Sequence, residues 1–434
     1  MSTSGVLIIH RNPFEPFPYD RWLRDYDGDV VVLAARDKIE LFGEEVPAGN
    51  LGYARLEVLD DFKDEELVYA RAFELATEYR VRHVVAHFEG DVIMAARLRE
   101  RLGLPGPWTD DVAPYRDKAL MKALVQEAGV EVAPHTVPCT AADARAFAER
   151  HGFPLVLKNR SGYTSIGLRI LRDRAELERH LAAEYGAGPR DDLLLEAYVE
   201  NKMCHVDGLV VGGRVVVAWP SQYQYALASF GSDPGARIDL TLDPDDPLTG
   251  RLLELTDRIV AALGRPGGRL RDHAIHAEIF HTPDDRLVLC EIACRVGGAK
   301  IREVFQVLFG TNLGELDTRA QLGLPLPGLE PVLRGGRRPR PARMSGQALM
   351  MKRPGVIRSV PDVPDEDWVE RFWLYARPGQ VVPPASGSSD FLLAAVASGP
   401  DRAECERRLR LLGARFEAQT TIEAARTPAP VGAR

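Results

Sequence analysis

Two short runs of alternating side chains, separated by a turn, constrain this chain more than any other stretch of its sequence. Over 276–280 and again over 287–292 the side chains divide between two faces in the pattern of two short strands, with Glu278 and Phe280 opposite Ala277 and Ile279, and Leu287, Leu289 and Glu291 opposite Val288, Cys290 and Ile292. Thr282-Pro-Asp-Asp285 between them has the composition of a tight turn. A turn centred on the two aspartates places Glu278 directly opposite Glu291 on one face of the hairpin.

This pairing of two carboxylates predicts a bound cation. Like charges directly opposite each other across two strands are destabilising, and a divalent cation between them removes the repulsion. Proteins hold Mg²⁺ with a few carboxylate oxygens when a nucleotide's phosphates supply other ligands. Leu155-Val-Leu-Lys158 adds a lysine on a predicted strand, just before a glycine-bearing loop. The two stretches together predict a site for ATP and magnesium.

Lysine is rare in this chain, which strengthens the prediction for Lys158. Only eight of the 55 basic residues are lysines, so arginine is the default cation. A lysine on a predicted buried strand is therefore unlikely to be there by chance. Its compact ammonium suits a phosphate oxygen better than an apolar core.

Bulk composition narrows the possible partners and compartment. The 434 residues suffice for two or three domains. A net charge of −8 argues against a nucleic-acid or anionic-membrane partner. No apolar run reaches the length of a membrane span, and Gly5-Val-Leu-Ile-Ile9 is too short for a signal peptide. The odd count of five cysteines points to the reducing cytoplasm. Cys290 and Cys294 are expected to be buried thiols rather than zinc ligands.

The first 112 residues are expected to form an α/β domain. Strands and helices alternate there, which predicts a parallel sheet with helices on its faces. No G-x-G-x-x-G follows the first strand, so nothing supports a dinucleotide site. The expected strands are 5–9, 29–34 and 81–86, and the expected helices are 64–79 and 91–102.

A second domain is expected over residues 113–330. Periodicity predicts four helices, at 118–128, 141–151, 174–185 and 247–263. It also predicts strands at 154–158, 168–171 and 193–199. A hairpin over 206–217 is expected to turn on Gly212-Gly213.

The remainder divides into three short parts. Residues 331–343 are rich in arginine, proline and glycine and are expected to be a surface linker. Residues 344–426 are predicted to form a β-rich extension with a helix near 402–412. The last residues, 427–434, are expected to be a disordered tail.

Four further features have both a functional and a structural interpretation. Ser161–Gly167 contains glycines and hydroxyls that could fold over phosphates, or form an ordinary hairpin loop. His205 alternates with apolar neighbours, so a satisfied structural histidine is favoured. Arg295 could stabilise a transferring phosphoryl group or neutralise the glutamate pair, and the two roles are compatible. Tyr223 could line a pocket or simply pack.

The order of these motifs resembles that of the ATP-grasp superfamily, from about residue 80 to 325. A helix begins after Asp117-Lys118, and a strand lysine precedes the glycine loop. Glu196-Ala-Tyr-Val-Glu200 follows, and Glu291-Ile-x-x-Arg295-x-Gly-Gly closes the glutamate hairpin. The resemblance implies a fold of mixed α/β (α+β) class. It has an N-terminal parallel-sheet domain, a mobile lid at roughly 140–205, a central antiparallel-sheet domain and the β-rich extension.

The resemblance also implies roles for individual residues. ATP phosphates would be held by Lys118 and Lys158, and the lid loop would contribute Ser161, Gly162, Ser165 and Gly167. Adenine would be read by Glu196 and the backbone of Tyr198 and Val199, and ribose by Glu200 and His205. Glu278 and Glu291 would bind Mg²⁺, or Mn²⁺ in its place. Arg295 would contact an acyl phosphate.

Three positions depart from the family pattern. Ala293 stands where an asparagine usually supplies a third metal ligand. Asn201-Lys-Met203 replaces a Gly-x-Glu that often contacts ribose. Val296-Gly-Gly-Ala-Lys300 replaces the Val-Glu-His of biotin carboxylases, which argues against a carboxylase that uses bicarbonate.

The remaining resemblance is to the carboxylate–amine ligases of the superfamily, including the L-amino acid ligases. It implies an ATP-dependent enzyme that joins a small carboxylate to an amine through an acyl phosphate and releases ADP and phosphate. A homodimer is possible. Lys300 and Arg302 could hold a substrate carboxylate, or lie as solvated charges at a helix start. The alternatives are an ATP-grasp enzyme for a phosphorylated or ribonucleotide substrate, and a nucleotide-binding protein without catalysis.

Overall fold

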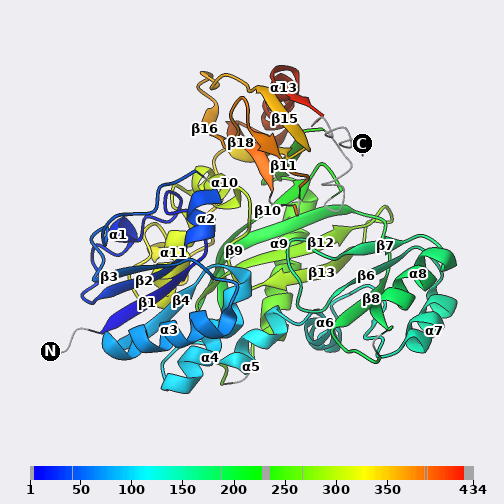
Figure 1. Cartoon of the computed structure of the whole chain (residues 1–434), viewed down its shortest axis with the longest axis horizontal. Coiled ribbons are helices and arrows are strands. Elements are labelled where there is room, and N and C mark those ends of the chain that lie inside the picture. The colour runs from blue at the N-terminus through cyan, green and yellow to red at the C-terminus, as the bar shows by residue number, and fades with distance from the viewer. Residues whose placement is uncertain are drawn as a thin grey trace, which may run out of the picture.

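The computed structural model describes residues 4–424 except 42, 187, 227–234, 266, 386 and 389. The expected tail at 427–434 lies outside these residues. The described part of the chain forms a mixed α/β fold with a four-stranded parallel sheet, a four-stranded lid sheet, an eight-stranded central sheet and a small three-stranded sheet (Figure 1). No helix within it is long and apolar enough to cross a membrane.

The N-terminal sheet has the strand order β3-β2-β1-β4, and all its strands are parallel. Its strands are β1 (Gly5–His10), β2 (Val30–Ala35), β3 (Arg55–Leu59) and β4 (Val81–Ala86). Three of them lie within one residue of their predicted positions. The prediction missed β3, a five-residue edge strand with no fully buried side chain.

Helices cover both faces of this sheet. On one face α3 (Glu65–Glu78) and α4 (Val92–Leu102) bury an apolar cluster with β1 and β4. The other face packs against α1 (Tyr19–Trp22) and the segment that follows the later helix α11 (Leu313–Gln321). Short elements complete the domain: α2 (Arg36–Leu41), η1 (Glu89–Asp91), α5 (Thr109–Val112) and η2 (Ala113–Tyr115).

The lid is an antiparallel sheet with the strand order β5-β8-β6-β7, covered on one face by two helices (Figure 1). Helix α6 (Lys118–Glu127) leads into it. The strands are β5 (His135–Thr136), β6 (Leu155–Asn159), β7 (Arg169–Leu171) and β8 (Leu193–Ala197), and the helices are α7 (Ala141–His151) and α8 (Arg174–Glu184). All but β5 were predicted, and β5 has only two residues.

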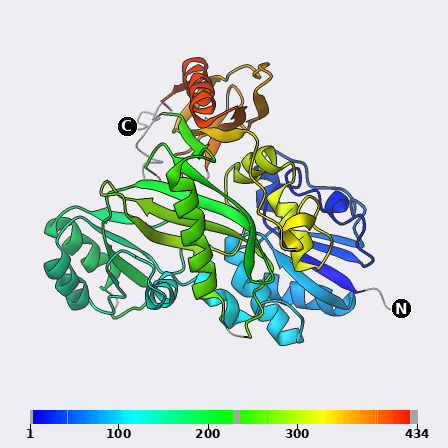
Figure 2. The same cartoon turned by 180° about the vertical axis from the view of Figure 1, so that it is seen from behind.

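The central sheet is antiparallel throughout, in the order β13-β12-β9-β10-β11-β14-β18-β16. The predicted hairpin turns on Gly212-Gly213, both at positive φ, between β9 (Lys202–Val211) and β10 (Arg214–Tyr223). The neighbouring strands are β11 (Arg237–Thr241), β12 (His273–His281) and β13 (Leu287–Ala293). Figure 2 shows α9 (Pro247–Leu263) lying across one face, where it and α6 bury the largest apolar cluster. On the other face pack α10 (Ile301–Phe309) and α11.

The C-terminal extension continues this sheet. Strand β14 (Met344–Met351) pairs with β11, and β18 (Phe391–Gly399) and β16 (Val369–Leu374) follow. Helix α13 (Arg402–Gln419), longer than the predicted 402–412, packs against them. A small separate sheet contains β15 (Gly355–Ser359), β17 (Val381–Val382) and β19 (Thr421–Glu423), and α12 (Glu330–Leu333) occupies the start of the expected linker.

Candidate active site

The glutamate hairpin is β12 and β13, and Glu278 does lie opposite Glu291. The predicted turn is wrong by one residue, because Ile279 pairs with Leu289 rather than Cys290. A β-bulge between these two pairs compensates for the shifted turn. Cys290 is the extra residue of β13, so that Cys290 and Glu291 together oppose Glu278. The predicted pairing of carboxylates is therefore right, but it arises from a bulge that alternation alone does not reveal.

A buried lysine holds the bulge in place. Lys122 on α6 is fully buried, and its Nζ lies 3.1 Å from the carbonyl oxygen of Cys290 and 3.5 Å from that of Leu289. The same ammonium lies 2.9 Å from Oε1 of Glu196, on lid strand β8. Sequence reasoning missed this residue. Its signal was present, because Lys118 and Lys122 are four residues apart on one helix face in a chain with few lysines.

Glu196 lies between two lysines, and it also lines a nucleotide-sized cavity. Lys158 Nζ is 2.8 Å from its Oε2, opposite the contact with Lys122. Burial opposes ionisation of Glu196, but the two ammonium groups outweigh it and lower the pKa to about 2. The carboxylate is thus charged and held by the two lysines at the wall of the cavity, and its contact with adenine stays a prediction. Tyr198 and Val199 just beyond it line the nucleotide-sized cavity, so their backbone remains available for the base.

A cavity of about 400 Å³ lies between the lid and the central sheet. Its apolar wall includes Val156, Ile170, Met203 and Phe280, which suits a flat heterocycle. Lys118 lies at the polar end, where its Nζ is 3.3 Å from Glu291 and 2.5 Å from the carbonyl oxygen of Gly162. The predicted site residues that line this cavity are Lys118, Lys158, Gly162, Ser165, Glu196, Tyr198, Val199, Tyr223, Glu278 and Glu291.

The glycine loop closes onto the N-terminal domain. Thr164 and Ser165 both have left-handed φ values, which turn the loop sharply. Arg116 donates a hydrogen bond of 2.7 Å to the carbonyl oxygen of Ser161, and the ring of Tyr163 packs edge-on against Phe88. Ser161 and Gly167 themselves do not line the cavity. The loop therefore lines the nucleotide cavity with Gly162, Tyr163, Ser165 and Ile166. Its first residue, Ser161, is held by Arg116.

A second, smaller cavity adjoins the first and shares Lys118 and Glu291 with it. Arg295 lies there, and its Nε donates a 3.0 Å hydrogen bond to Oε2 of Glu89. Arg116 binds the other oxygen of the same carboxylate. Burial opposes ionisation of Glu89, yet the two guanidinium groups lower its pKa. Arg295 is thus held rigidly beside Glu291, as its predicted role requires.

Sequence reasoning did not find Glu89 or Arg116. Glu89 lies at the carboxyl end of the N-terminal sheet, just after β4, where ligands of open α/β sheets commonly bind. A ligand site at this edge of the sheet was therefore predictable from the order of strands and helices. The partnership with Arg295, 206 residues away, was not.

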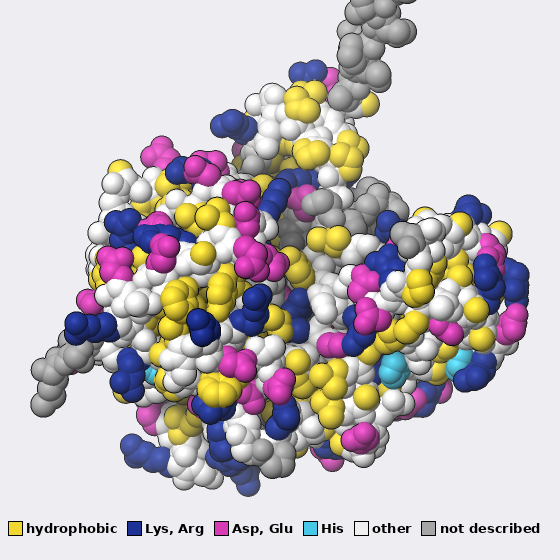
Figure 3. Space-filling model, turned by 60° about the horizontal axis from the view of Figure 1, so that its bottom comes forward, with side chains coloured by type: hydrophobic (Ala, Val, Ile, Leu, Met, Phe, Trp, Pro, Cys, Tyr) yellow, Lys and Arg dark blue, Asp and Glu magenta, His cyan; other side chains and the backbone are white. Residues whose placement is uncertain are grey.

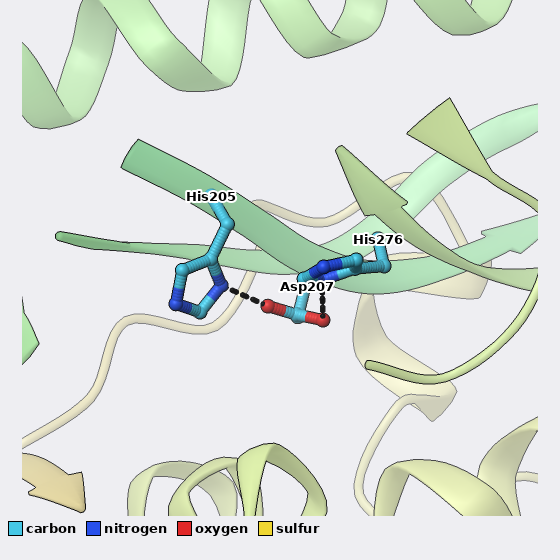
Figure 4. A group of neighbouring side chains, drawn as sticks. All are labelled: His205, Asp207 and His276. Atoms are coloured by element: carbon cyan, nitrogen blue, oxygen red, sulfur yellow. Dashed lines mark hydrogen bonds and ion pairs between the residues drawn. The ribbon is translucent and has the colours of Figure 1, made fainter. Parts of the chain in front are cut away.

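His205 belongs to a buried ion network and does not line the larger cavity, so the geometry gives no support to its predicted contact with ribose. Figure 4 shows the carboxylate of Asp207 between the rings of His205 and His276, with nitrogen–oxygen distances of 2.5 and 2.9 Å. The other ring nitrogen of His205 lies 3.0 Å from both oxygens of Asp239, to which Gln347 also donates. Both ring nitrogens are therefore engaged, as the structural interpretation held.

This network predicts a pH-dependent contribution to stability. Burial opposes the charged form of His205, but Asp239 and Asp207 raise its pKa from 6.5 to about 10. A raised folded-state pKa stabilises the protein fully below pH 6.5, and the contribution is lost as the pH rises to 10. We expect the loss of unfolding free energy in His205→Gln, on the order of 4 kcal/mol at pH 6, to shrink towards pH 10. Urea unfolding of both proteins across this range measures it, and a pH-independent difference contradicts the assignment.

Three other predicted residues lie outside both cavities. Glu200 is exposed on the connection between β8 and β9. The Lys300 ammonium is covered by the C-terminal extension, 2.8 Å from Tyr375 Oη and 3.8 Å from the centre of the Trp373 ring. Arg302 lies over the ring of Phe17. The geometry thus gives no support to ribose binding by Glu200 or to a substrate-carboxylate contact by the other two.

Glu278 and Glu291 fit a divalent cation. They are paired carboxylates on the wall of the larger cavity, which Lys118 and Lys158 also line. Lys118 forms an ion pair with Glu291. Burial opposes ionisation of Glu291, but Lys118 and Lys158 lower its pKa, so its carboxylate is charged at neutral pH. Oxygen donors of this kind suit Mg²⁺ or Mn²⁺.

Charges of both signs are spread over the surface around these domains. Figure 3 shows acidic and basic side chains interspersed over the face it presents. Many of the arginines are in ion pairs with neighbouring carboxylates, such as Arg145 with Glu178 on the lid.

The central antiparallel sheet and the smaller lid sheet, which enclose two lysines and paired carboxylates, have the fold of ATP-grasp ligase structures, as the order of the motifs predicted. Residues 117–213 match the family model of the carbamoyl-phosphate synthase L chain, ATP binding domain. This match includes α6, the lid and the first hairpin strand of the central sheet.

Known proteins with a similar sequence or fold include two amino acid ligases. The L-arginine-specific L-amino acid ligase of Bacillus subtilis is 24% identical over 263 residues, which are 59% of this chain and 62% of that protein. The crystal structure of an L-amino acid ligase from Bacillus licheniformis has a TM-score of 0.75 at 20% identity, covering 98% of this chain and 99% of that one. The biotin carboxylase domain of Hydrogenobacter thermophilus 2-oxoglutarate carboxylase, complexed with MgADP, has a TM-score of 0.68 at 19% identity, covering 98% and 91%.

Proposed function

We propose that this chain is an ATP-dependent carboxylate–amine ligase that joins an amino acid, or another small carboxylate, to an amine. The observation that carries the proposal is the junction of the two cavities. Lys118 and Glu291 line both of them, and Arg295 faces the smaller one. A nucleotide's terminal phosphate at the shared end of the larger cavity would therefore lie next to Lys118 and Arg295, and a substrate carboxylate would attack it there. The similarity to two L-amino acid ligases supports the same reaction.

The reaction has two steps. An oxygen of the carboxylate attacks the γ-phosphorus of ATP, the bond to the β-phosphate oxygen breaks, and ADP leaves. The amine nitrogen then attacks the acyl carbon, the bond from that carbon to the phosphate oxygen breaks, phosphate leaves with the electron pair of this bond, and the nitrogen loses a proton. A divalent cation on Glu278 and Glu291, when bound, would neutralise phosphate charge during the transfer.

The chain's own residues would bind and orient the reactants. Lys118 and Lys158 would offset charge on the phosphates, and Arg295 would stabilise the transferring group. The loop around Gly162 would exclude water, which otherwise hydrolyses an acyl phosphate. Glu89 would hold Arg295 in place, through the hydrogen bonds it accepts from that guanidinium.

The test is a screen for ADP release over pairs of amino acids, with the mass of every product recorded. We expect at least one pair to give ADP release that requires the amine, together with a product whose mass is the sum of the substrates less one water. ADP release that never depends on an amine, with no condensed product, contradicts the proposal.

A further inference from the structure

The β-bulge places a thiol beside the two carboxylates of the cation site. In a regular strand neighbouring side chains point to opposite faces, so Cys290 would turn away from Glu291. The bulge removes this alternation, and both residues line the nucleotide cavity together with Glu278. One ligand atom from each of the three residues lies within 4.8 Å of the others. Metal–oxygen and metal–sulfur bonds of about 2.0–2.3 Å let three such atoms share one ion after little movement.

The Cys290 thiol is buried and has no hydrogen-bond partner among the described residues. It is 7% exposed. Two other buried thiols do have partners, because Cys204 accepts from Gln222 and Cys405 donates to the carbonyl oxygen of Ala397. Lys122 fixes the backbone of Cys290 from the opposite side, through its carbonyl oxygen. The sulfur is therefore held towards the carboxylates with its own bonding capacity unused.

Ala293, at the position on β13 where the family pattern has a third ligand, cannot supply one. Ala293 pairs with His276 on β12 and offers no donor atom in its side chain. Among the described residues, β13 thus offers the Glu291 carboxylate and the Cys290 thiol to a cation at this position, and β12 offers the Glu278 carboxylate.

We propose that Cys290 is the third protein ligand of the divalent cation held by Glu278 and Glu291, which makes this site bind thiophilic cations such as Cd²⁺ and Zn²⁺ strongly. Sulfur ligands favour soft and borderline cations, whereas carboxylates alone favour Mg²⁺. On binding, the thiol releases its proton to solvent and its sulfur donates an electron pair to the cation, with no change of oxidation state. Cys290 is a buried thiol, as expected from the sequence, and the proposal adds a role as metal ligand. The inference rests on the proposed function only in taking this cavity as the cation site.

The test uses Cd²⁺ alone, added to the full-length protein without nucleotide. We expect wild-type protein to develop the ultraviolet charge-transfer absorption of a cadmium–thiolate bond. Cys290→Ser should lose this absorption and bind Cd²⁺ at least about tenfold more weakly, since even the loss of groups that support a ligand costs that much. Cys294→Ser is the matched control, because that thiol lines a different cavity and should leave both readouts unchanged.

Two further variants keep the test decisive. Glu278→Gln retains the thiol and should still weaken Cd²⁺ binding about tenfold, because the carboxylate shares the ion. Cys290→Ala checks that any loss does not come from a misfolded serine variant, and circular dichroism verifies the fold of each protein. Unchanged absorption in Cys290→Ser, or loss of it in Cys294→Ser, overturns the proposal. Because these readouts need neither ATP nor substrate, a failure of the ligase screen leaves them intact.

Discussion

Replacing Glu291 with glutamine is expected to lower the rate of ADP formation by about 10³-fold, the scale of losing one group that stabilises a transition state. The amide cannot carry the negative charge that a cation and Lys118 both require at this position. The nitrogen of the amide would also face Lys118, which has no acceptor to offer it. A coupled assay for ADP under saturating ATP and substrates measures the effect.

The matched control for this variant is Asp285→Asn. Asp285 lies in the turn of the same hairpin, its side chain is 69% exposed, and its carboxylate pairs with Arg251 and His281. We expect its rate to stay within about twofold of wild type, because exposed ion pairs contribute little. If Glu291→Gln is no slower than this control, the glutamate hairpin is not the site of phosphoryl transfer.

Replacing Lys122 with methionine is expected to destabilise the protein by about 3 kcal/mol, in the range for breaking a buried ion pair. Methionine fills much of the same volume, so the loss is mainly electrostatic. It leaves Glu196 with one lysine in place of two, and it leaves two carbonyl oxygens of the bulge without their donor. The midpoint of urea unfolding measures the change.

The exposed Lys63→Met is the control for Lys122→Met and should change the midpoint very little. A double-mutant cycle with Glu196→Gln isolates the contribution of the ion pair. Additive effects of the two substitutions would mean that Lys122 acts through the carbonyl oxygens of the bulge alone. An undiminished stability of the single variant contradicts the assignment of Lys122 as the anchor of β13.

Local features of the sequence were sufficient for α3, α4, α6, α7, α8, α9 and most of α13, for the main strands of the N-terminal and lid sheets, and for the glutamate hairpin, but α10 and α11 were missed. The helices at 141–151 and 247–263 were predicted to the residue, because capping side chains mark their beginnings. Thr140 and Asp246 accept hydrogen bonds from the first turns of these helices. Lys158 was recognisable because a lysine on a buried strand needs a partner of opposite charge.

Features that depend on contacts between distant segments could not be predicted from local sequence patterns. The bulge at Cys290 needs Lys122 from another element, and alternation of side chains gives no sign of either. The network of His205 needs Asp239 from a strand 34 residues later. Arg295 needs Glu89 from a different domain. Each of these pairs is set by how the sheets pack, and a single sequence contains no record of that packing.

The continuation of the central sheet into the C-terminal extension ties the active site to the last part of the chain. Strand β14 is hydrogen-bonded along β11, and Gln347 on it donates to Asp239 while accepting from the backbone of Lys300. A chain that ended before Met344 would leave β11 as an open edge, with unpaired backbone groups that invite other strands. It would also remove a hydrogen bond from the buried charges behind the cation site. The extension is therefore an integral part of the central domain, and proteolysis between them should cost solubility and activity together.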